Sequence, residues 1–249
     1  MSPARGVDVG NQLDGFLESC AKATWTEQLW YAAIEYFTSQ GFSTICYQHL
    51  PPLGAPDEDK IRVASSGYDE SWNRKYIGEK MYRTDPFPAH ALSGEESFRW
   101  SEIRKLREMT DPELQILELL EGRGGDGLAV PVFGPGGRNG YFGLGFSDPD
   151  SVMAKTMVYR QQMACQAAHL RYCHLMRQHL PEMPVLSMRE RELLGWVARG
   201  KSNNVIAEIM SISPHTVDAY LRRVFYKLGT TDRISAVVKA IGSGLIRAY

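Results

Sequence analysis

Apolar residues recur at helical spacing through the last quarter of the chain, between residues 186 and 249. Residues three and four positions apart share one face of a helix, so each such run predicts one amphipathic helix. The apolar positions of the three runs are Leu193, Leu194 and Val197; Val205, Ile206, Ile209 and Met210; and Val217, Leu221, Val224 and Leu228. The pattern therefore predicts three short, consecutive helices in this region.

Capping residues separate these helices. Ser187 and Glu190 have the spacing of a capping box, in which the two side chains satisfy free backbone N–H groups. Ser202 is placed to cap the second helix. Ser213 precedes Pro214, and proline is well tolerated at the first helical position because its missing N–H is not needed there. These signals predict a tight turn directly before the third helix.

The third helix has a polar face opposite its apolar stripe. The residues on that face are His215, Thr216, Asp218, Ala219, Arg222 and Arg223. Two short helices, a turn and a polar third helix form the element that enters a DNA major groove. A three-helix bundle without DNA-binding function is the alternative, but it requires neither the Ser-Pro cap nor outward arginines.

The preceding residues show helical and strand periodicity together, which indicates an α+β fold. Helices are expected over Thr24–Gln40, Asp111–Glu121 and Asp148–His179, and strands over Ser43–Leu50, Ile61–Ser66, Leu128–Phe133 and Tyr141–Ser147. Helices on both sides of an antiparallel sheet predict an α-β-α sandwich. The chain as a whole is thus predicted to be an N-terminal sandwich followed by an all-α, four-helix helix-turn-helix domain.

Two prolines, Pro181 and Pro184, indicate a short linker between these parts. The expected domains are residues 1–176 and 186–249, joined by residues 177–185. A length of 249 residues is ample for two domains.

Composition and charge are those of a soluble globular protein, with 43% hydrophobic and 23% charged residues. Residues 182–249 carry ten Lys and Arg against six Asp and Glu, whereas the rest of the chain is net acidic. A basic C-terminal module suits contact with phosphates. No apolar run reaches the length of a membrane span, and the first residues lack a signal peptide. We therefore expect a cytoplasmic protein without membrane contact.

The four cysteines, Cys20, Cys46, Cys165 and Cys173, lack the paired spacing of a metal site. Buried free thiols in a reduced compartment are the simplest interpretation, and redox sensing is the alternative. No cofactor or metal is expected.

Aromatic residues and one carboxylate gather in the N-terminal part. Tyr68, Trp72 and Tyr76 are spaced four apart, which predicts a shared helix face, and Asp85 and Trp100 follow. Aromatic rings that exclude water, with a few polar groups that orient a ligand, are typical of a small-molecule pocket. Ordinary core aromatics, with Asp85 as a helix cap, are the alternative that periodicity alone favours.

Both halves of the chain resemble the LuxR family of transcription regulators. The C-terminal motifs are Leu186-Ser-Met-Arg-Glu190, Gly200-Lys-Ser202, Ile206-Ala-Glu208, Ile212-Ser213, Thr216-Val217, Lys227-Leu-Gly229 and Gly244-Leu-Ile246. The N-terminal pattern is Tyr68, Trp72, Tyr76, Asp85-Pro86 and Trp100, followed by Gly127-Leu-Ala-Val-Pro131. The resemblance implies a quorum-sensing regulator that binds an N-acyl-homoserine lactone through its N-terminal domain.

The resemblance also implies roles for individual residues. Trp72 would donate its indole N–H to the lactone carbonyl, Asp85 would accept the amide N–H, and Tyr68 would donate to the acyl-amide carbonyl. Tyr76 and Trp100 would enclose the lactone and the start of the acyl chain. A buried amide without partners costs about 1–3 kcal/mol, so one acceptor and one donor suit this ligand.

Three positions depart from the family pattern. Phe87 replaces a small or hydroxylated residue, Asn73 a frequent arginine, and Gly143 a serine or threonine that often helps to bind the amide carbonyl. The lost hydroxyl at Gly143 removes a hydrogen bond worth roughly 0.5–1.5 kcal/mol. The sequence therefore favours an unusual or relaxed ligand preference. An orphan regulator with a non-standard ligand requirement, or none, is the alternative.

For the DNA-binding domain the resemblance implies that Asp218 and Arg222 face bases. Arg222 is suited to guanine, Asp218 to cytosine N4 and Ala219 to a thymine methyl group. Tyr220 stands where the family often has histidine, which leaves the base code open, and Asp218 is alternatively a solvated charge or a partner of Arg222. The expected phosphate contacts are Lys201, Ser202, Thr216 and Arg223.

A fourth helix from Asp232 is expected to expose Ile234, Val237, Val238 and Ile241. A self-complementary contact would bury that surface, so we expect a homodimer on inverted-repeat DNA. Packing inside the module is the alternative.

Three other functions are alternatives to this one. The chain has six histidines but no nucleophile elbow, zinc signature or phosphate loop, so it is not expected to be an enzyme. The first fifty residues lack the acidic cluster of a phosphorylation receiver. A constitutive DNA-binding protein with a sandwich used only for dimerisation remains open.

Overall fold

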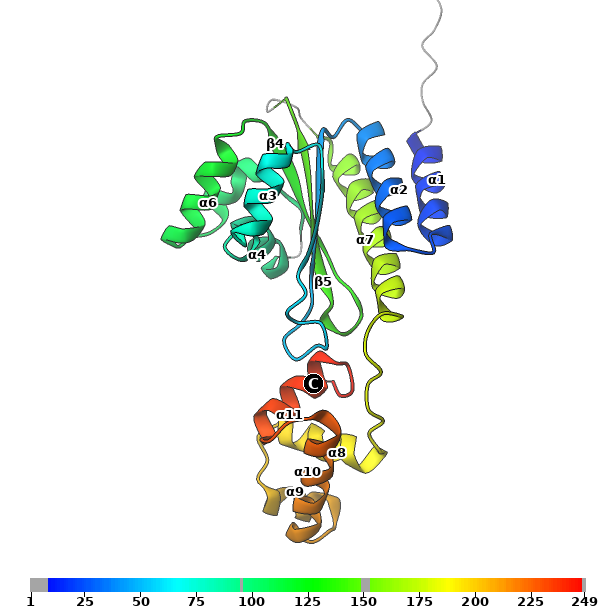
Figure 1. Cartoon of the computed structure of the whole chain (residues 1–249), viewed down its shortest axis with the longest axis vertical. Helices are drawn as coiled ribbons and strands as arrows, with labels where there is room; N and C mark the ends of the chain where they lie inside the picture. Colours follow the sequence, from blue (N-terminus) through cyan, green and yellow to red (C-terminus); the bar gives the residue numbers. More distant parts are fainter. Residues whose placement is uncertain (1–8, 95, 149–152, 248–249) are drawn as a thin grey trace, which may run out of the picture. The chain divides into compact units, whose positions relative to one another are not determined.

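The computed structural model describes residues 9–94, 96–148 and 153–247 (Figure 1). The chain forms two compact units, one of residues 1–50 and 61–179 and the other of residues 51–60 and 180–249. Among the described helices, none combines the length and the apolar character needed to cross a bilayer.

A five-stranded antiparallel sheet forms the centre of the first unit, in the order β2-β1-β5-β4-β3. The strands are β1 (Thr44–Leu50), β2 (Arg62–Ser66), β3 (Phe98–Arg99), β4 (Asp126–Val132) and β5 (Asn139–Phe146). Side chains alternate between the two faces of a strand. On β1, Ile45 and Tyr47 enter the main hydrophobic core, whereas Thr44 and Cys46 line a pocket on the other face.

Two helices cover the first face of the sheet, α2 (Thr26–Ser39) and α7 (Lys155–Arg177), and α1 (Val9–Lys22) packs against both of them (Figure 1). Aromatic rings fill the space between these helices and the sheet. Phe37 lies at the centre, with its ring centroid 5.9 Å from those of Phe16 and Phe142. Phe37 is fully buried, so this layer is the main core of the unit.

Shorter helices cover the opposite face, so the α-β-α sandwich is confirmed (Figure 1). They are α3 (Glu70–Gly78), α4 (Pro86–Ser93), α5 (Ile103–Leu106) and α6 (Asp111–Glu121), with 3₁₀ turns η1 (Met81–Arg83) and η2 (Trp100–Glu102). A third 3₁₀ turn, η3 (Pro135–Gly137), lies in the connection between β4 and β5. Here the buried residues form smaller clusters, one of them around Phe87, Ile103 and Leu117. This less densely filled layer contains the pocket described below.

The predicted boundaries need several corrections. The long helix was expected from Asp148, but α7 begins at Lys155, after Ala154 in an extended conformation. Residues 149–152, which were also expected to be helical, lie outside the described residues. Helices α1, α4 and α5 and strand β3 were not predicted. Two prolines in eight residues obscured α4, although Asp85 caps it and Pro86 occupies its first turn.

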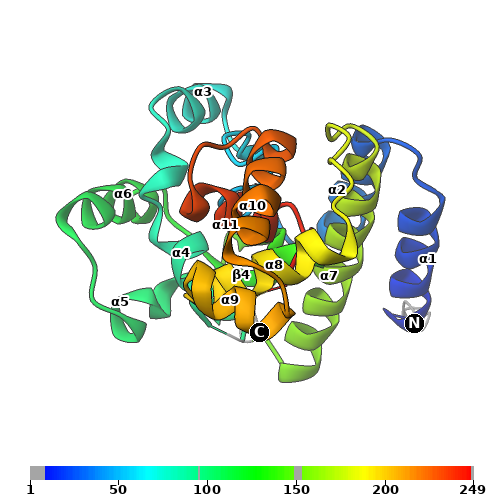
Figure 2. The ribbon, with the colours of Figure 1, turned by 90° about the horizontal axis from the view of Figure 1, so that it is seen from below.

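The second unit contains four helices: α8 (Met188–Ala198), α9 (Asn203–Met210), α10 (Pro214–Leu228) and α11 (Arg233–Gly242). Figure 2 shows them grouped together. All the predicted caps are present, including the reciprocal capping box of Ser187 and Glu190. The apolar stripe of α10 is buried as expected, with Val217 and Val224 fully enclosed.

Only part of the α11 surface is exposed. Ile234 is 72% exposed, as expected. Val237 and Ile241, which were expected at the surface, are partly buried against the cores of the module. They face inward because they lie beside Ala236 and Ala240, which pack fully into the same cluster.

Candidate functional site

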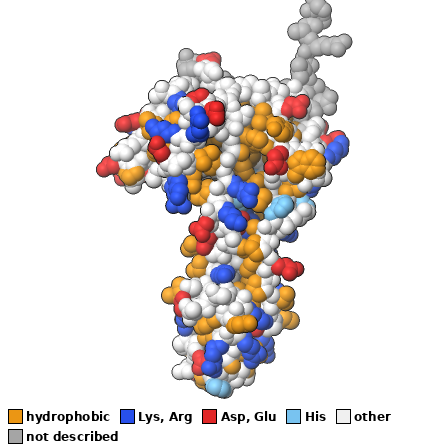
Figure 3. Space-filling model, viewed as in Figure 1, with side chains coloured by type: hydrophobic (Ala, Val, Ile, Leu, Met, Phe, Trp, Pro, Cys, Tyr) orange, Lys and Arg blue, Asp and Glu red, His pale blue; other side chains and the backbone are white. Residues whose placement is uncertain are grey.

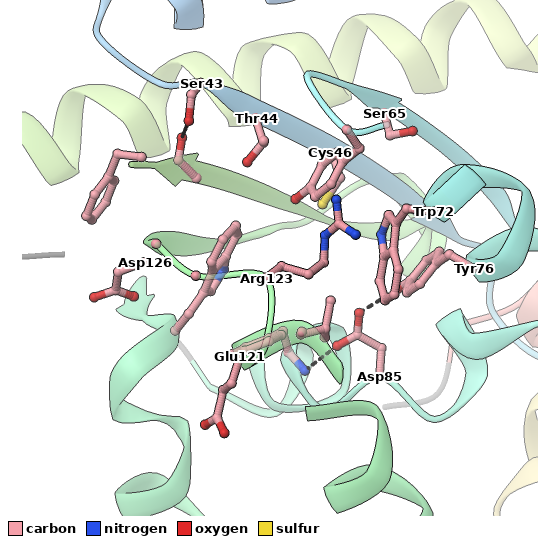
Figure 4. A pocket seen from close by; sticks show the side chains of 18 of the residues that line it. Ser43, Thr44, Cys46, Ser65, Trp72, Tyr76, Asp85, Glu121, Arg123 and Asp126 are labelled. Carbon is pink, nitrogen blue, oxygen red and sulfur yellow. Dashed lines mark hydrogen bonds between the residues drawn. The ribbon is translucent and has the colours of Figure 1, made fainter. Parts of the chain in front are cut away.

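A pocket of about 560 Å³ lies between the sheet and the layer of α3, α4 and α6 (Figure 4). It brings together residues that are far apart in the sequence. Six of the seven predicted ligand-binding residues line it: Tyr68, Trp72, Tyr76, Asp85, Phe87 and Trp100. Among the described residues the aromatic cluster therefore surrounds a space, which ordinary core packing would have filled.

Tyr68 reaches the pocket from a turn and not from the helix that its spacing predicted. Helix α3 begins at Glu70, and its N-cap is Asp69, whose carboxylate accepts the Trp72 backbone N–H at 2.7 Å. The shared helix face thus holds only for Trp72 and Tyr76, whose ring centroids are 5.9 Å apart. Tyr68 lies outside α3 because Asp69 is the N-cap, and the residue before an N-cap is not helical.

Asp85 is the central polar group of the pocket. Its Oδ2 accepts the Tyr76 hydroxyl at 2.5 Å, and its Oδ1 accepts the Phe87 backbone N–H at 2.9 Å (Figure 4). Gln48 Nε2 donates in turn to the Tyr76 hydroxyl at 2.8 Å. Burial raises the pKa of Asp85 to about 6, although the hydrogen bonds from Tyr76 and the Phe87 backbone act to lower it. An ionised carboxylate has further lone pairs, so Asp85 can still accept from a ligand.

The Trp100 ring packs against Gly127 and Gly145 of the sheet. A Cβ atom at Gly127 would be 2.5 Å from the Trp100 ring, and one at Gly145 would be 2.9 Å from it. The indole N–H donates to the Tyr141 hydroxyl at 3.2 Å. The absence of side chains at these positions lets a large ring form one wall of the pocket.

Gly143, the seventh predicted residue, does not itself line the pocket. A Cβ there would lie 2.6 Å from Cys46 Sγ and 2.8 Å from the Tyr141 hydroxyl. These two groups take the space where a serine or threonine would stand. Tyr141, which the sequence analysis missed, places its hydroxyl beside Gly143 and lines the pocket.

Arg123 is a second pocket residue that the sequence analysis missed. It follows α6, and its guanidinium carbon lies 4.6 Å from the centre of the Trp72 ring (Figure 4). The same guanidinium pairs with Asp69, the N-cap of α3. Hydrogen bonds from Ser71 and Arg123 lower the pKa of Asp69. An arginine beside two glycines, Gly124 and Gly125, was the available sequence signal.

Replacing Gly127 by alanine tests the packing of Trp100 against the sheet. The new methyl group would overlap Trp100, and overpacking of this kind costs about 1–3 kcal/mol. We expect a lower melting temperature and weaker ligand binding by Gly127→Ala. Gly78→Ala is the matched control, because nothing lies within 4 Å of its new Cβ. Equal melting temperatures for the two variants would contradict the packing described.

The second unit presents α10 as a candidate nucleic-acid interface. Ser213 caps the helix by accepting the Thr216 backbone N–H at 3.1 Å, and Pro214 occupies the first turn. The Asp218 carboxylate accepts a hydrogen bond from Asn203 Nδ2 at 2.6 Å. Asn203, and not Arg222, is therefore its partner in the described part of the chain. This bond joins α10 to α9 and fixes the direction of the Asp218 side chain.

Cationic side chains accompany this polar face. Lys201, Arg222 and Arg223 are exposed, and the Arg223 guanidinium lies 4.8 Å from the centre of the Tyr220 ring. Figure 3 shows Lys and Arg side chains gathered over the end of the unit that contains α9 and α10. Exposed arginines on a capped helix can contact both base edges and phosphates.

A small-molecule pocket in one unit and a helix-turn-helix in the other are typical of a transcription regulator that binds a small molecule. The family model of the autoinducer binding domain matches residues 26–172. The model of bacterial regulatory proteins of the luxR family matches residues 184–240. The chain belongs to the LuxR-type family of autoinducer-binding transcription regulators.

Curated relatives agree with this assignment. The chain is 45% identical over 216 residues to the transcriptional activator SolR of Ralstonia solanacearum, which covers 83% of this chain and 86% of SolR. It is 29% identical over 213 residues to the quorum sensing-dependent regulator RpaR of Rhodopseudomonas palustris, with 84% of each covered. A 32% identical putative regulator, y4qH of Sinorhizobium fredii, matches over 72% of this chain and 55% of its own length. These relatives are transcription regulators.

A solved structure shares the fold. Escherichia coli SdiA superposes with a TM-score of 0.67 and 17% identity, covering 96% of this chain and 99% of SdiA. A structure of SdiA in complex with octanoyl-rac-glycerol gives a TM-score of 0.66 at 18% identity, covering 97% and 98% of the two chains.

Proposed function

We propose that the pocket binds an N-acyl-homoserine lactone and that binding controls recognition of an operator by the helix-turn-helix unit. The observation that carries this proposal is the buried Asp85 carboxylate, which lies in a pocket walled by Trp72, Tyr76 and Trp100. A ligand amide N–H needs such an acceptor, and a buried carboxylate needs donors.

The other polar groups of the pocket suit the two carbonyl groups of the ligand. Tyr68 and Trp72 each carry a donor, and both line the pocket with Asp85. Phe87 and Trp100, with ring centroids 5.8 Å apart, offer apolar surface for the start of an acyl chain. A volume of about 560 Å³ lies in the range typical of small-molecule pockets.

Calorimetric titration of the purified chain with lactones of different acyl length tests this assignment. We expect saturable binding of one equivalent and a preference among chain lengths. Octanoyl-rac-glycerol, the compound bound in the SdiA complex, is an informative further probe because it has an acyl chain but no lactone. Binding of the glycerol compound but of no lactone would favour a non-standard ligand, and binding of neither would contradict the proposal.

The altered surroundings of Gly143 support an unusual ligand preference. Tyr141 and Cys46 occupy the position of a family serine or threonine, and Phe87 adds bulk. A tight and selective response to one ordinary short-chain lactone would contradict this part of the proposal.

The active form is proposed to be a cytoplasmic homodimer on an inverted-repeat site. Exposed apolar side chains support a self-contact: Ile234 on α11, and Tyr159, Met163 and Leu170 along α7. Exposed apolar side chains that gather on one surface often mark an interface. Light scattering of the full chain, with and without lactone, measures the association.

Two substitutions separate base reading from phosphate contact. Arg222→Ala is expected to weaken binding to a selected operator by about 1–3 kcal/mol and to relax specificity at one base. Lys201→Ala is expected to weaken binding to all sequences alike and to reduce its salt dependence. Binding to operators selected from random DNA measures both effects. A uniform loss for Arg222→Ala would remove it from the base-reading set.

A further inference from the structure

Three side chains of metal-binding type lie close together on the face of the sheet opposite the pocket. His49 at the end of β1 meets His169 and Cys173 of α7, and all three residues are buried. One ligand atom from each residue can be chosen so that all three lie within 4.8 Å of one another. His169 and Cys173 are one helical turn apart and therefore share one face of α7.

The sulfur–nitrogen distance between Cys173 and His169 is close to that at a tetrahedral zinc ion. Cys173 Sγ lies 3.5 Å from His169 Nε2. A zinc ion with Zn–S of about 2.3 Å and Zn–N of about 2.05 Å at a tetrahedral angle separates sulfur and nitrogen by about 3.6 Å. Thiolate and imidazole are also the donors that zinc prefers among protein side chains.

The surroundings of His169 supply the outer contacts of such a site. The Tyr47 hydroxyl lies 2.8 Å from His169 Nδ1. Metal-bound histidines usually bond a second partner through the other ring nitrogen, which fixes the ring. The Arg138 carbonyl oxygen lies 2.8 Å from His169 Nε2 and 3.9 Å from Cys173 Sγ. This oxygen accepts the Nε2 proton, so a metal ion bound to Nε2 would replace that hydrogen bond.

Two glycines let the backbone approach these ligand atoms closely. A Cβ at Gly134 would lie 2.8 Å from His169 Nε2 and 3.0 Å from Cys173 Sγ. A Cβ at Gly140 would lie 3.1 Å from the His169 ring. A side chain at either position would collide with His169, so both glycines allow the present placement of its ring.

We propose that His49, His169 and Cys173 bind one Zn²⁺ ion that joins β1 to α7 and stabilises the ligand-binding domain. Binding moves the His169 proton from Nε2 to Nδ1, which then donates to the Tyr47 hydroxyl, and Cys173 releases its thiol proton to solvent. The ion binds the folded arrangement and not the unfolded chain, so it raises the stability of the domain by mass action.

Cobalt(II), a spectroscopic substitute for zinc, provides the direct test. The full chain, stripped with a chelator, is titrated with Co²⁺ and then with Zn²⁺. We expect one equivalent of Co²⁺ to bind with a sulfur-to-cobalt charge-transfer band, which Zn²⁺ then removes. We also expect Zn²⁺ to raise the melting temperature of the wild-type protein.

Matched cysteine variants decide whether the cluster holds the metal. Cys173→Ser should lose the charge-transfer band and the zinc-dependent shift in melting temperature. Cys165→Ser, which changes another buried thiol of α7, should keep both. His49→Gln provides an independent ligand deletion if Cys173→Ser folds poorly, and it should weaken Co²⁺ binding at least tenfold. The proposal would be overturned if the wild-type protein failed to bind Co²⁺. It would also be overturned if Cys173→Ser and His49→Gln bound Co²⁺ as tightly as the wild-type protein.

Discussion

Asp85→Asn is expected to weaken binding of the proposed lactone by roughly 10- to 100-fold, because a hydrogen bond to a charged group is worth about 1.5–3 kcal/mol. Asparagine keeps the shape of the side chain and one acceptor oxygen, but it loses the charge. That oxygen must also serve the Phe87 N–H, which Asp85 accepts at 2.9 Å. Calorimetric titration of wild type and variant measures the change.

The same substitution changes the stability of the ligand-free protein in the opposite direction. Burial raises the pKa of Asp85 to about 6, so the folded state holds a proton in a range where the unfolded chain has released it. The stability of the wild-type protein therefore falls as pH rises from about 4 to about 6. At neutral pH the ionised group costs on the order of 3 kcal/mol, which Asp85→Asn removes.

Ligand affinity should depend on pH through the same group. The amide N–H favours the ionised carboxylate, so affinity should fall as pH drops below about 6. The affinity of Asp85→Asn should stay flat across this range. Glu121→Gln is the matched control, because Glu121 also lines the pocket but pairs outward with Arg104 at 2.8 Å. A strong loss of affinity in the control, or none in Asp85→Asn, would contradict the assignment.

Lys227→Met should destabilise the helix-turn-helix unit by about 1.5 kcal/mol. Glu190 is 2% exposed, and its Oε2 lies 2.7 Å from Lys227 Nζ, whereas the Lys227 side chain is 34% exposed. Water can therefore partly replace the lysine, and a hydrogen bond to a charged group is worth about 1.5–3 kcal/mol. The Ser187 backbone N–H still donates to Glu190 at 2.7 Å, so we expect the lower end of that range.

Amide hydrogen exchange of α8 and α10 in the full chain measures this loss locally. Arg189→Met is the matched control, because the ion pair of Arg189 and Glu192 is exposed and is worth at most about 1 kcal/mol. The double variant Lys227→Met with Glu190→Gln should recover part of the stability, since no charge then remains buried. Equal protection in Lys227→Met and Arg189→Met would contradict the role of the pair.

The effect of Lys227→Met should also depend on pH. Burial acts to raise the pKa of Glu190, but hydrogen bonds from Lys227 and the Ser187 backbone outweigh it and lower the pKa. A carboxylate with a lowered pKa stabilises the folded state above its unfolded pKa and loses that contribution as acid protonates it. The difference between wild type and Lys227→Met should therefore shrink in acid.

Local signals made the second unit predictable from sequence. Each of its first three helices begins at a serine with a defined capping role, and Pro214 marks the turn. Such caps depend on residues three positions apart, which a sequence displays directly. The surface of α11 was harder to predict, because whether Val237 and Ile241 face solvent depends on packing from other helices.

The pocket was only partly predictable, for a physical reason. Tyr68, Trp72 and Asp85 could be named from a family pattern, but Tyr141 and Arg123 reach the pocket through tertiary placement. The register that sets Gly143 opposite Cys46 is a long-range pairing. Side-chain space of this kind follows from strand pairing and not from local periodicity.

Recovery of small molecules from the purified protein tests the central claim most directly. Cells that express the wild-type chain, Asp85→Asn or Glu121→Gln are grown with a panel of acyl-homoserine lactones, and the bound compounds are quantified by mass spectrometry. The account predicts one equivalent of lactone in the wild type and in Glu121→Gln, and little in Asp85→Asn. A wild-type protein that retains none of the panel, or an Asp85→Asn variant that retains as much, would contradict it.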